Sequence, residues 1–214
     1  METINLKKND PNYPSALQQY LGKDAPDTIT AIGDLDIFRH NPTAFFCSSK
    51  CPGDLIVKTY DLAQILRDAG MTVISGFHSP MERECITILL RGAQPIIICP
   101  ARSINNMRIN KEYKKHLKDN RLLFLSPFDE NQPRISAQRS LYRNLFVAAM
   151  SAAVFVIHAG PASKTEAFCK EIISWQKPVY TFESDYNKNL IKMGARPVNM
   201  ENVSLWANLF AGNI

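Results

Sequence analysis

The sequence predicts an α/β protein whose sheet is doubly wound and mostly parallel, with helices on both faces. Six short apolar runs alternate with stretches of helical periodicity from residue 43 onward, and the connections between them are of ordinary length. The run at residues 152–157 is almost continuously apolar and precedes the breakers Gly160 and Pro161, which is typical of a strand buried on both faces of a parallel sheet. Right-handed crossovers between such strands place helices on both faces.

The amino-terminal part of the chain lacks this regular alternation. Residues 1–41 are polar and irregular, and we expect them to form an extension packed on the main domain at residues 42–214. A short helix is expected to start near Pro14, because proline is tolerated in a first helical turn. We expect residues 28–32 to form an edge strand.

The main domain alternates strands with helices. The helix at residues 54–69 has apolar residues at helical spacing and ends at Gly70, because glycine commonly follows the last turn of a helix. The helix at residues 136–151 follows a polar loop that contains Pro127 and Pro133. In chain order, the expected strands are 43–47, 71–76, 95–100, 121–126, 153–158 and 178–182, and the expected helices are 54–69, 83–91, 110–119, 136–151, 164–175, 187–193 and 204–210.

The composition indicates a protein of the cell interior without a membrane span. The chain has 214 residues, 45% of them hydrophobic, and a net charge of +5 that permits polyanion binding without demanding it. It has no apolar segment long enough to span a bilayer, and its start lacks the hydrophobic stretch of a signal peptide. The five cysteines are odd in number, and none forms a C-x-x-C pair. We therefore expect reduced core thiols, a cytoplasmic location, and neither a metal site nor a cofactor.

Three loops at the carboxyl ends of the expected strands are the place where a ligand would bind. Ligands of doubly wound sheets bind outside these ends, near the point where the strand order reverses. The loops at residues 48–53, 76–80 and 159–165 fall there, and each offers Gly, Ser or Thr donors to an anion. The chain has neither a dinucleotide fingerprint nor a phosphate loop. Ser163 either caps a helix or helps to bind phosphate at that helix's amino end.

A series of motifs between residue 13 and residue 197 occurs in the order of a known family. They are Y-P-S-A-L at 13–17, F-F-C-S-S-K at 45–50, A-G-M-T-V-I-S-G-F at 69–77, L-Y-R-N-L-F-V-A-A-M at 141–150, S-K-T-E-A at 163–167 and L-I-K-M-G-A-R-P at 190–197. In this order they resemble the DprA (Smf) family of DNA-processing proteins, a Rossmann-like group related to the lonely guy proteins. The resemblance covers most of the chain and implies a Rossmann-like fold.

Two loops depart from the family's pattern. Ser48, Ser49 and Lys50 stand where the family has Gly-Ser-Arg, so the charge is kept while the bidentate fork of arginine is lost. The loop after residue 76 lacks the family's glycines and carries Glu82 and Glu84, which add negative charge. We also expect the protein to lack the winged-helix-like domain that ends many members, so the chain resembles a divergent, core-only member.

The resemblance implies a non-catalytic protein that binds single-stranded DNA and hands it to a RecA-type recombinase during natural transformation. It also implies a homodimer. A cationic groove would neutralise phosphates and release counterions, while aromatic side chains would stack on bases. The basic run at residues 111–118 either belongs to this groove or is a solvated helix face. The expected nucleic-acid or phosphate-binding residues are Ser48, Ser49, Lys50, Ser75, Gly76, Phe77, Arg102, Arg143, Asn144, Gly160, Ser163, Lys164 and Thr165.

Two other functions remain open. The lonely guy proteins remove a ribose phosphate from a nucleotide, and Arg143 and Glu166 stand at positions similar to their arginine and glutamate. Such a hydrolase would hold the phosphate or base with the arginine and stabilise an oxocarbenium-like centre with the carboxylate. Alternatively, the pocket is a sensor for a nucleotide-derived ligand that is not turned over, since Glu82 and Glu84 suit ribose hydroxyls or a base edge.

Overall fold

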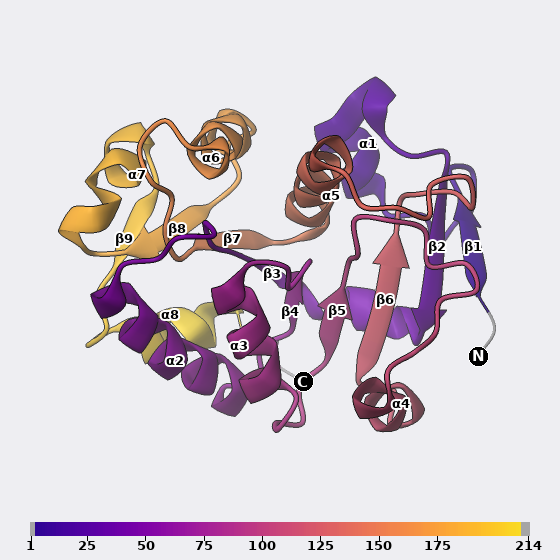
Figure 1. The fold of residues 1–214 in the computed structure, drawn as a ribbon, viewed down its shortest axis with the longest axis horizontal. Coiled ribbons are helices and arrows are strands. Elements are labelled where there is room, and N and C mark those ends of the chain that lie inside the picture. Colours follow the sequence, from indigo (N-terminus) through magenta and orange to yellow (C-terminus); the bar gives the residue numbers. More distant parts are fainter. Residues whose placement is uncertain (1–2, 211–214) are drawn as a thin grey trace.

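The computed structural model describes residues 3–210, in which one nine-stranded sheet is covered by helices on both faces (Figure 1). The strands are β1 (Ile4–Lys7), β2 (Thr28–Gly33), β3 (Thr43–Phe46), β4 (Val73–Ser75), β5 (Ile96–Ile98), β6 (Leu122–Ser126), β7 (Ala153–Val156), β8 (Val179–Phe182) and β9 (Arg196–Val198). The helices are α1 (Ser15–Leu21), α2 (Gly53–Asp68), α3 (Pro80–Leu89), α4 (Lys111–Lys118), α5 (Ala137–Met150), α6 (Lys164–Ser174), α7 (Lys188–Met193) and α8 (Val203–Phe210).

The order of the strands in the sheet is β1-β2-β6-β5-β4-β3-β7-β8-β9. The strands from β6 to β9 in this order are parallel, while β2 is antiparallel to both β1 and β6. The chain moves outward from β3 to β6 and then returns to β7 on the other side of β3, where Thr43 pairs with Ala153. The strand order therefore reverses between β3 and β7, which is where sheets of this kind bind ligands.

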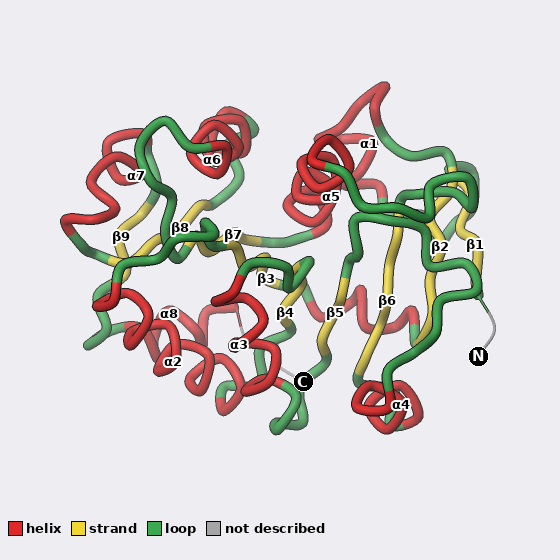
Figure 2. Tube along the Cα trace, viewed as in Figure 1, coloured by secondary structure: helices red, strands yellow, loops and turns green. Residues whose placement is uncertain are grey.

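Each face of the sheet has its own apolar core. Along β3, Ala44 and Phe46 pack in one core and Phe45 in the other, because successive side chains of a strand point to opposite faces. The first core includes buried residues of α1, α5, α6 and α7, and the second includes buried residues of α2, α3, α4 and α8. Figure 2 shows the same two groups of helices on opposite sides of the strands. The predicted fold class, a doubly wound and mostly parallel sheet with helices on both faces, is confirmed.

The expected edge position of residues 28–32 is wrong. Strand β2 lies inside the sheet between β1 and β6, with Thr30 opposite Ser126 and Ala31 opposite Ile4. The true edge is β1, whose four residues, I-N-L-K, bury one side chain and therefore give a weak strand pattern in the sequence. The first 41 residues thus contribute two strands to the sheet of the main domain.

Helix α3 begins at Pro80, three residues earlier than the sequence predicted. A capping box starts it: the Glu82 N–H donates to Ser79 Oγ at 3.3 Å, and the Ser79 N–H donates to the Glu82 carboxylate at 3.4 Å. Pro80 occupies the first helical turn, where its missing N–H costs no hydrogen bond. Among residues 3–210, no helix combines the length and the apolar character needed to cross a bilayer.

Candidate nucleic-acid interface

A cleft of about 740 Å³ lies beside the point where the strand order reverses. Its walls come from four separate parts of the chain: the end of β3 with Cys47 and Ser49, the start of α3, the first two turns of α5, and the first two turns of α6. The parallel sheet brings these segments together because the carboxyl ends of its strands share one edge.

Five of the thirteen expected binding residues line this cleft. They are Ser49, Arg143, Asn144, Lys164 and Thr165. The structure therefore brings the loop after β3 and the starts of α5 and α6 to one hollow. The remaining eight expected residues are not part of its lining, and they are Ser48, Lys50, Ser75, Gly76, Phe77, Arg102, Gly160 and Ser163. Lys50 is exposed one residue beyond Ser49.

Arg143 is held almost completely inside the protein while it lines the cleft. Only 4% of it is exposed, and its Nη1 donates to the Cys99 carbonyl at 2.9 Å while its Nε donates to Asn144 Oδ1 at 2.8 Å. Desolvation lowers the pKa of Arg143, and the nearby Glu82 carboxylate opposes this shift. A Cβ atom at Gly76 would overlap the guanidinium, so only glycine leaves room for this arginine. Within residues 3–210, Nη2 of Arg143 has no hydrogen-bond acceptor.

Glu82 takes up the backbone donors that a phosphate would otherwise use. Its carboxylate accepts from the Cys47 N–H at 3.0 Å, the His78 N–H at 2.8 Å and, more weakly, the Ser79 N–H at 3.4 Å. The residue is 5% exposed and lies at the wall of the cleft. Convergent backbone N–H groups of this kind bind anions, and here the bound anion is the carboxylate of Glu82. An external phosphate finds these donors occupied.

The amino end of α6 is capped by side chains of the chain itself, although the N–H groups of Lys164 and Thr165 have no acceptor among residues 3–210. Ser163 Oγ accepts from the Glu166 N–H at 3.1 Å, and the Glu166 carboxylate accepts from the Ala162 N–H at 2.6 Å and from Asn189 Nδ2 at 2.5 Å. Of the two readings of Ser163, the geometry supports the helix cap. Both carboxylate oxygens of Glu166 are engaged and the residue does not line the cleft, so the arrangement gives no support to its use as a hydrolase carboxylate.

Three further expected residues stabilise loops. The Ser75 hydroxyl donates to the Phe45 carbonyl at 2.7 Å and accepts from the Phe77 N–H at 3.2 Å. Phe77 is buried at a positive φ of 46°, so its ring belongs to the core. Arg102 lies in the β5–α4 connection, where its carbonyl accepts from Ser126 Oγ at 2.8 Å.

The cleft carries both signs of charge. Arg143 and Lys164 supply positive charge, while Glu82 and Glu171 supply negative charge. Sequence reasoning placed Glu82 near the pocket but missed its bonds to the loops, although the Ser79-x-x-Glu82 spacing is the signature of a capping box. Glu171 lies two turns into α6. It lines the cleft because of how α6 is oriented in the fold, which the sequence does not show.

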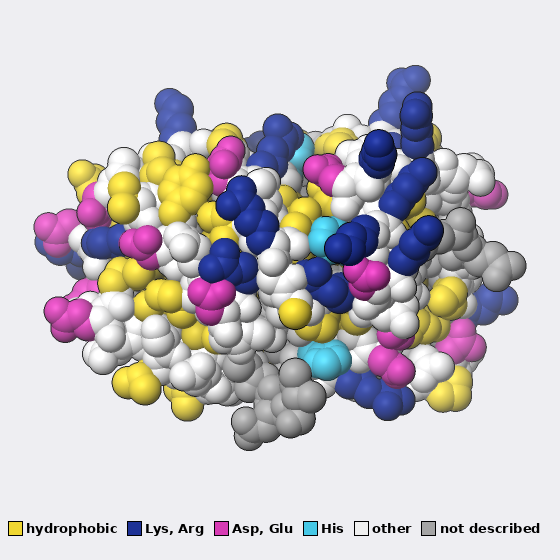
Figure 3. Space-filling model, turned by 90° about the horizontal axis from the view of Figure 1, so that it is seen from below, with side chains coloured by type: hydrophobic (Ala, Val, Ile, Leu, Met, Phe, Trp, Pro, Cys, Tyr) yellow, Lys and Arg dark blue, Asp and Glu magenta, His cyan; other side chains and the backbone are white. Residues whose placement is uncertain are grey.

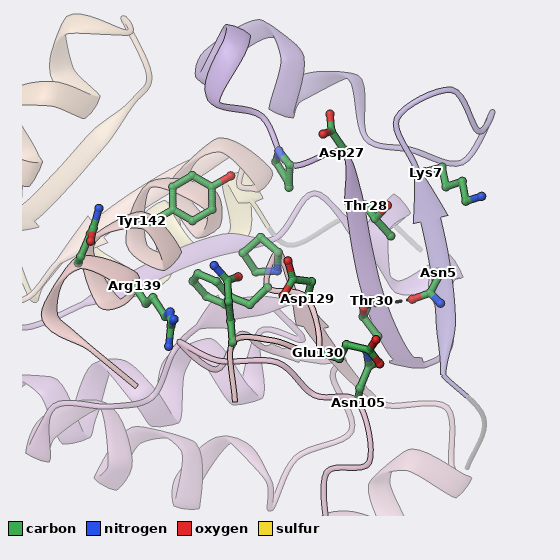
Figure 4. A pocket seen from close by; sticks show the side chains of 15 residues that line it. Asn5, Lys7, Asp27, Thr28, Thr30, Asn105, Asp129, Glu130, Arg139 and Tyr142 are labelled. Carbon is green, nitrogen blue, oxygen red and sulfur yellow. Dashed lines mark hydrogen bonds between the residues drawn. The ribbon is translucent and has the colours of Figure 1, made fainter. Parts of the chain in front are cut away.

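A second cleft, of about 820 Å³, lies on the other side of the start of α5 (Figure 4). Its side chains come from β1, β2, the loop after β6 and α5, and they include Asn5, Thr30 and Arg139. Tyr142 donates its hydroxyl to the Asp24 carbonyl at 2.7 Å, and burial is the main reason that the pKa of Tyr142 is raised to about 12. Gln138 lines both clefts, so the first turn of α5 separates two hollows along one edge of the sheet.

The reversal of strand order between β3 and β7, with a ligand-sized cleft beside it, defines a Rossmann-like α/β binding protein. A family model described as DNA recombination-mediator protein A matches residues 5–207, and the chain belongs to this family. The resemblance to the DprA family seen in the sequence is thereby confirmed.

Solved structures share the fold at low sequence identity. DNA processing protein A from Streptococcus pneumoniae is 18% identical with a TM-score of 0.78, over 96% of this chain and 74% of that one. DNA processing protein A from Helicobacter pylori, described for its single-stranded DNA binding mode, is 20% identical with a TM-score of 0.75, over 97% and 95%. The molybdenum cofactor carrier protein from Chlamydomonas reinhardtii is 13% identical with a TM-score of 0.53, over 79% and 98%. Comparison with curated proteins finds no sequence match.

Proposed function

We propose that this protein binds single-stranded DNA in the cleft beside β3 and α5 and acts in DNA processing without chemical turnover. The observation that carries the proposal is the convergence of Arg143, Lys164 and three neutral hydrogen-bonding residues on one hollow in a member of this family. The printed description of the Helicobacter pylori relative, which concerns single-stranded DNA binding, supports it.

Side chains provide the main phosphate contacts in this proposal. Glu82 already accepts from the N–H groups of Cys47 and His78, and Glu166 from that of Ala162. The side-chain donors that remain at the cleft include Lys164, Nη2 of Arg143 and the hydroxyl of Thr165. Binding through cationic side chains releases counterions and weakens as salt rises. We expect modest affinity that falls as salt rises, with a slope set by these few cationic contacts.

The test is the affinity of a short single-stranded oligonucleotide at about 50 and about 200 mM salt, measured by fluorescence anisotropy. The Lys164→Gln variant should bind more weakly, and the slope of log affinity against log salt should become shallower by about 0.7 if one phosphate contact is lost. Lys170→Gln is the matched control, because Lys170 is exposed on the same helix outside the cleft. Absence of binding at low salt, or equal behaviour of the two variants, contradicts the proposal.

A nucleotide-derived small ligand is the second candidate for the same cleft. Its volume of about 740 Å³ falls in the range of small-molecule sites, and the two carboxylates of Glu82 and Glu171 disfavour a long polyanion. A thermal-shift screen of nucleotides tests this candidate, because a ligand that binds only the folded state raises the melting temperature. A stabilising nucleotide that also displaces single-stranded DNA would place both in one site.

We extend the proposal to the partners that the family resemblance implies: a homodimer, a RecA-type recombinase, and a cytoplasmic role in natural transformation. Exposed apolar side chains on neighbouring helices, Val57 on α2 and Leu205 and Leu209 on α8, support self-association. Light scattering tests the dimer, and a recombinase-loading assay on single-stranded DNA tests the partner. We also propose that residues 1–41 form an extension of the main domain. Limited proteolysis tests this division of the chain.

A further inference from the structure

Helix α4 presents four lysines on one face. Lys111, Lys114, Lys115 and Lys118 follow the i, i+3, i+4, i+7 spacing, which places them in one stripe along a helix. All four are exposed. Glu112 is the only acidic residue between Lys111 and Lys118, so this short helix carries a concentrated positive charge.

The opposite face of α4 fixes the helix on the sheet. Leu117 is 3% exposed, and the Tyr113 ring packs edge-on against Phe124 of β6 with ring centroids 5.7 Å apart. His116 is half-buried and its Nδ1 lies 3.2 Å from Arg121 Nη1. The three side chains hold α4 in one orientation, so the lysine stripe faces outward.

The lysine stripe has no acidic partners within the part of the chain that the structure describes. None of its four lysines forms an ion pair, whereas Lys58 and Lys188 each lie 2.9 Å from an aspartate on their own helical segment. Like charges three and four residues apart repel one another and destabilise a helix. A polyanion laid along the stripe would remove this repulsion.

A basic connection leads toward the lysine stripe from the edge of the sheet that carries the clefts. Residues 99–110 join the carboxyl end of β5 to α4 (Figure 1), and they carry Arg102 and Arg108. Arg102 is half-buried near the end of β6, and Arg108 is exposed close to α4. Figure 3 shows Lys and Arg side chains gathered over the side of the molecule that carries α4.

We propose that the lysine stripe of α4, continued by Arg108, is a second binding site for the backbone of single-stranded DNA. It holds the part of a strand that extends beyond the cleft, and in this respect it rests on the proposed function. The stripe runs about 10 Å along the helix axis, which spans about three phosphates of a stacked strand. It recognises phosphate charge alone and adds no sequence preference.

The test separates the two sites by oligonucleotide length. In one variant, Lys111, Lys115 and Lys118 are replaced together by Gln, which keeps a good helix former at each exposed position. The matched control replaces three exposed lysines outside the stripe and outside both clefts, namely Lys23, Lys170 and Lys192. Circular dichroism checks that both variants are folded. Affinity is then measured for oligonucleotides of about 6 and about 30 nucleotides across a salt series.

The stripe variant should bind the short oligonucleotide within about twofold of the original protein, because the cleft is intact. For the long oligonucleotide, its salt slope should become shallower by about 2, and its affinity at moderate salt should fall about tenfold. If the stripe variant and the control bind the long oligonucleotide equally well, the second site is wrong. If the affinity of the stripe variant falls as much for the short oligonucleotide as for the long one, the second-site proposal is also wrong.

These outcomes are distinct from failure of the cleft. Lys164→Gln should weaken both oligonucleotides, whereas the stripe variant should weaken only the long one. Should the long oligonucleotide depend on the stripe while Lys164→Gln changes neither affinity, the stripe stands and the cleft proposal fails. Should Lys164→Gln alone matter, the cleft stands and the stripe proposal fails.

Discussion

Glu82→Gln should destabilise the protein because the charged carboxylate joins three backbone donors near a buried arginine. The side chain accepts N–H bonds at 2.8 and 3.0 Å from His78 and Cys47, with a weaker bond from Ser79, and its charge favours the charged form of Arg143. A hydrogen bond to a charged group contributes about 1.5–3 kcal/mol, and glutamine keeps one acceptor but turns its NH₂ group toward a donor.

Leaving a buried charge without its partner adds to this loss, so we expect the unfolding free energy to fall by about 3 kcal/mol. Urea denaturation at neutral pH, followed by circular dichroism, measures the change. Glu84→Gln is the control, since Glu84 is exposed and accepts only one long bond from Tyr60 at 3.4 Å, and it should stay within about 0.5 kcal/mol. A Glu82→Gln variant as stable as the control would refute the role assigned to this carboxylate.

Three more predictions test single features of the structure. Gly76→Ala should lower the unfolding free energy by more than about 2 kcal/mol in urea denaturation, because the new methyl group overlaps the guanidinium of Arg143. Burial lowers the pKa of Lys177 from 10.5 to about 8, so the unfolded chain binds the extra proton between these values and stability should rise with pH in that window. Relative to Lys177→Met, the original protein should therefore gain unfolding free energy from about pH 8 to about pH 10. The hydrogen bond from Cys47 lowers the pKa of Cys51, so mass spectrometry should find Cys51 alkylated first near neutral pH.

Each of these predictions has an outcome that contradicts it. Gly53→Ala is the control for position 76, because a Cβ at Gly53 meets nothing within 4 Å, and equal losses at the two positions would argue against the overlap. If the difference in unfolding free energy between the original protein and Lys177→Met stays constant from about pH 8 to about pH 10, the lowered pKa of Lys177 is contradicted. Faster alkylation of Cys85, whose pKa burial raises, would contradict the reactivity order of the thiols.

The sequence predicted most strands and helices of the main domain because each of these is marked by local chemistry. Gly70 sits at a positive φ of 72° immediately after α2, where a glycine terminates the helix as expected. The weak strands were missed because β1 buries one side chain and β9 contains Pro197. Because β1 was missed, residues 28–32 were wrongly expected to form the edge strand.

The candidate site was less predictable because its residues come from segments that are far apart in the chain. The motif around Arg143 located it on a helix that enters the site, but nothing in the sequence shows that its guanidinium lies over Gly76 and bonds to Cys99. The roles of Glu82 and Glu166 depend on backbone N–H groups, which sequence motifs do not display. Loops rich in Ser and Gly therefore predicted anion binding where the chain already supplies a carboxylate.

Hydrogen–deuterium exchange with and without a single-stranded oligonucleotide tests the central claim most directly, because it maps contacts without altering the protein. The account predicts slower exchange in residues 47–50, 137–144 and 163–168, which surround the cleft, and in α4 only when the oligonucleotide is long. Protection confined to other segments, such as α7 and β9, or no protection at saturating DNA, would contradict it.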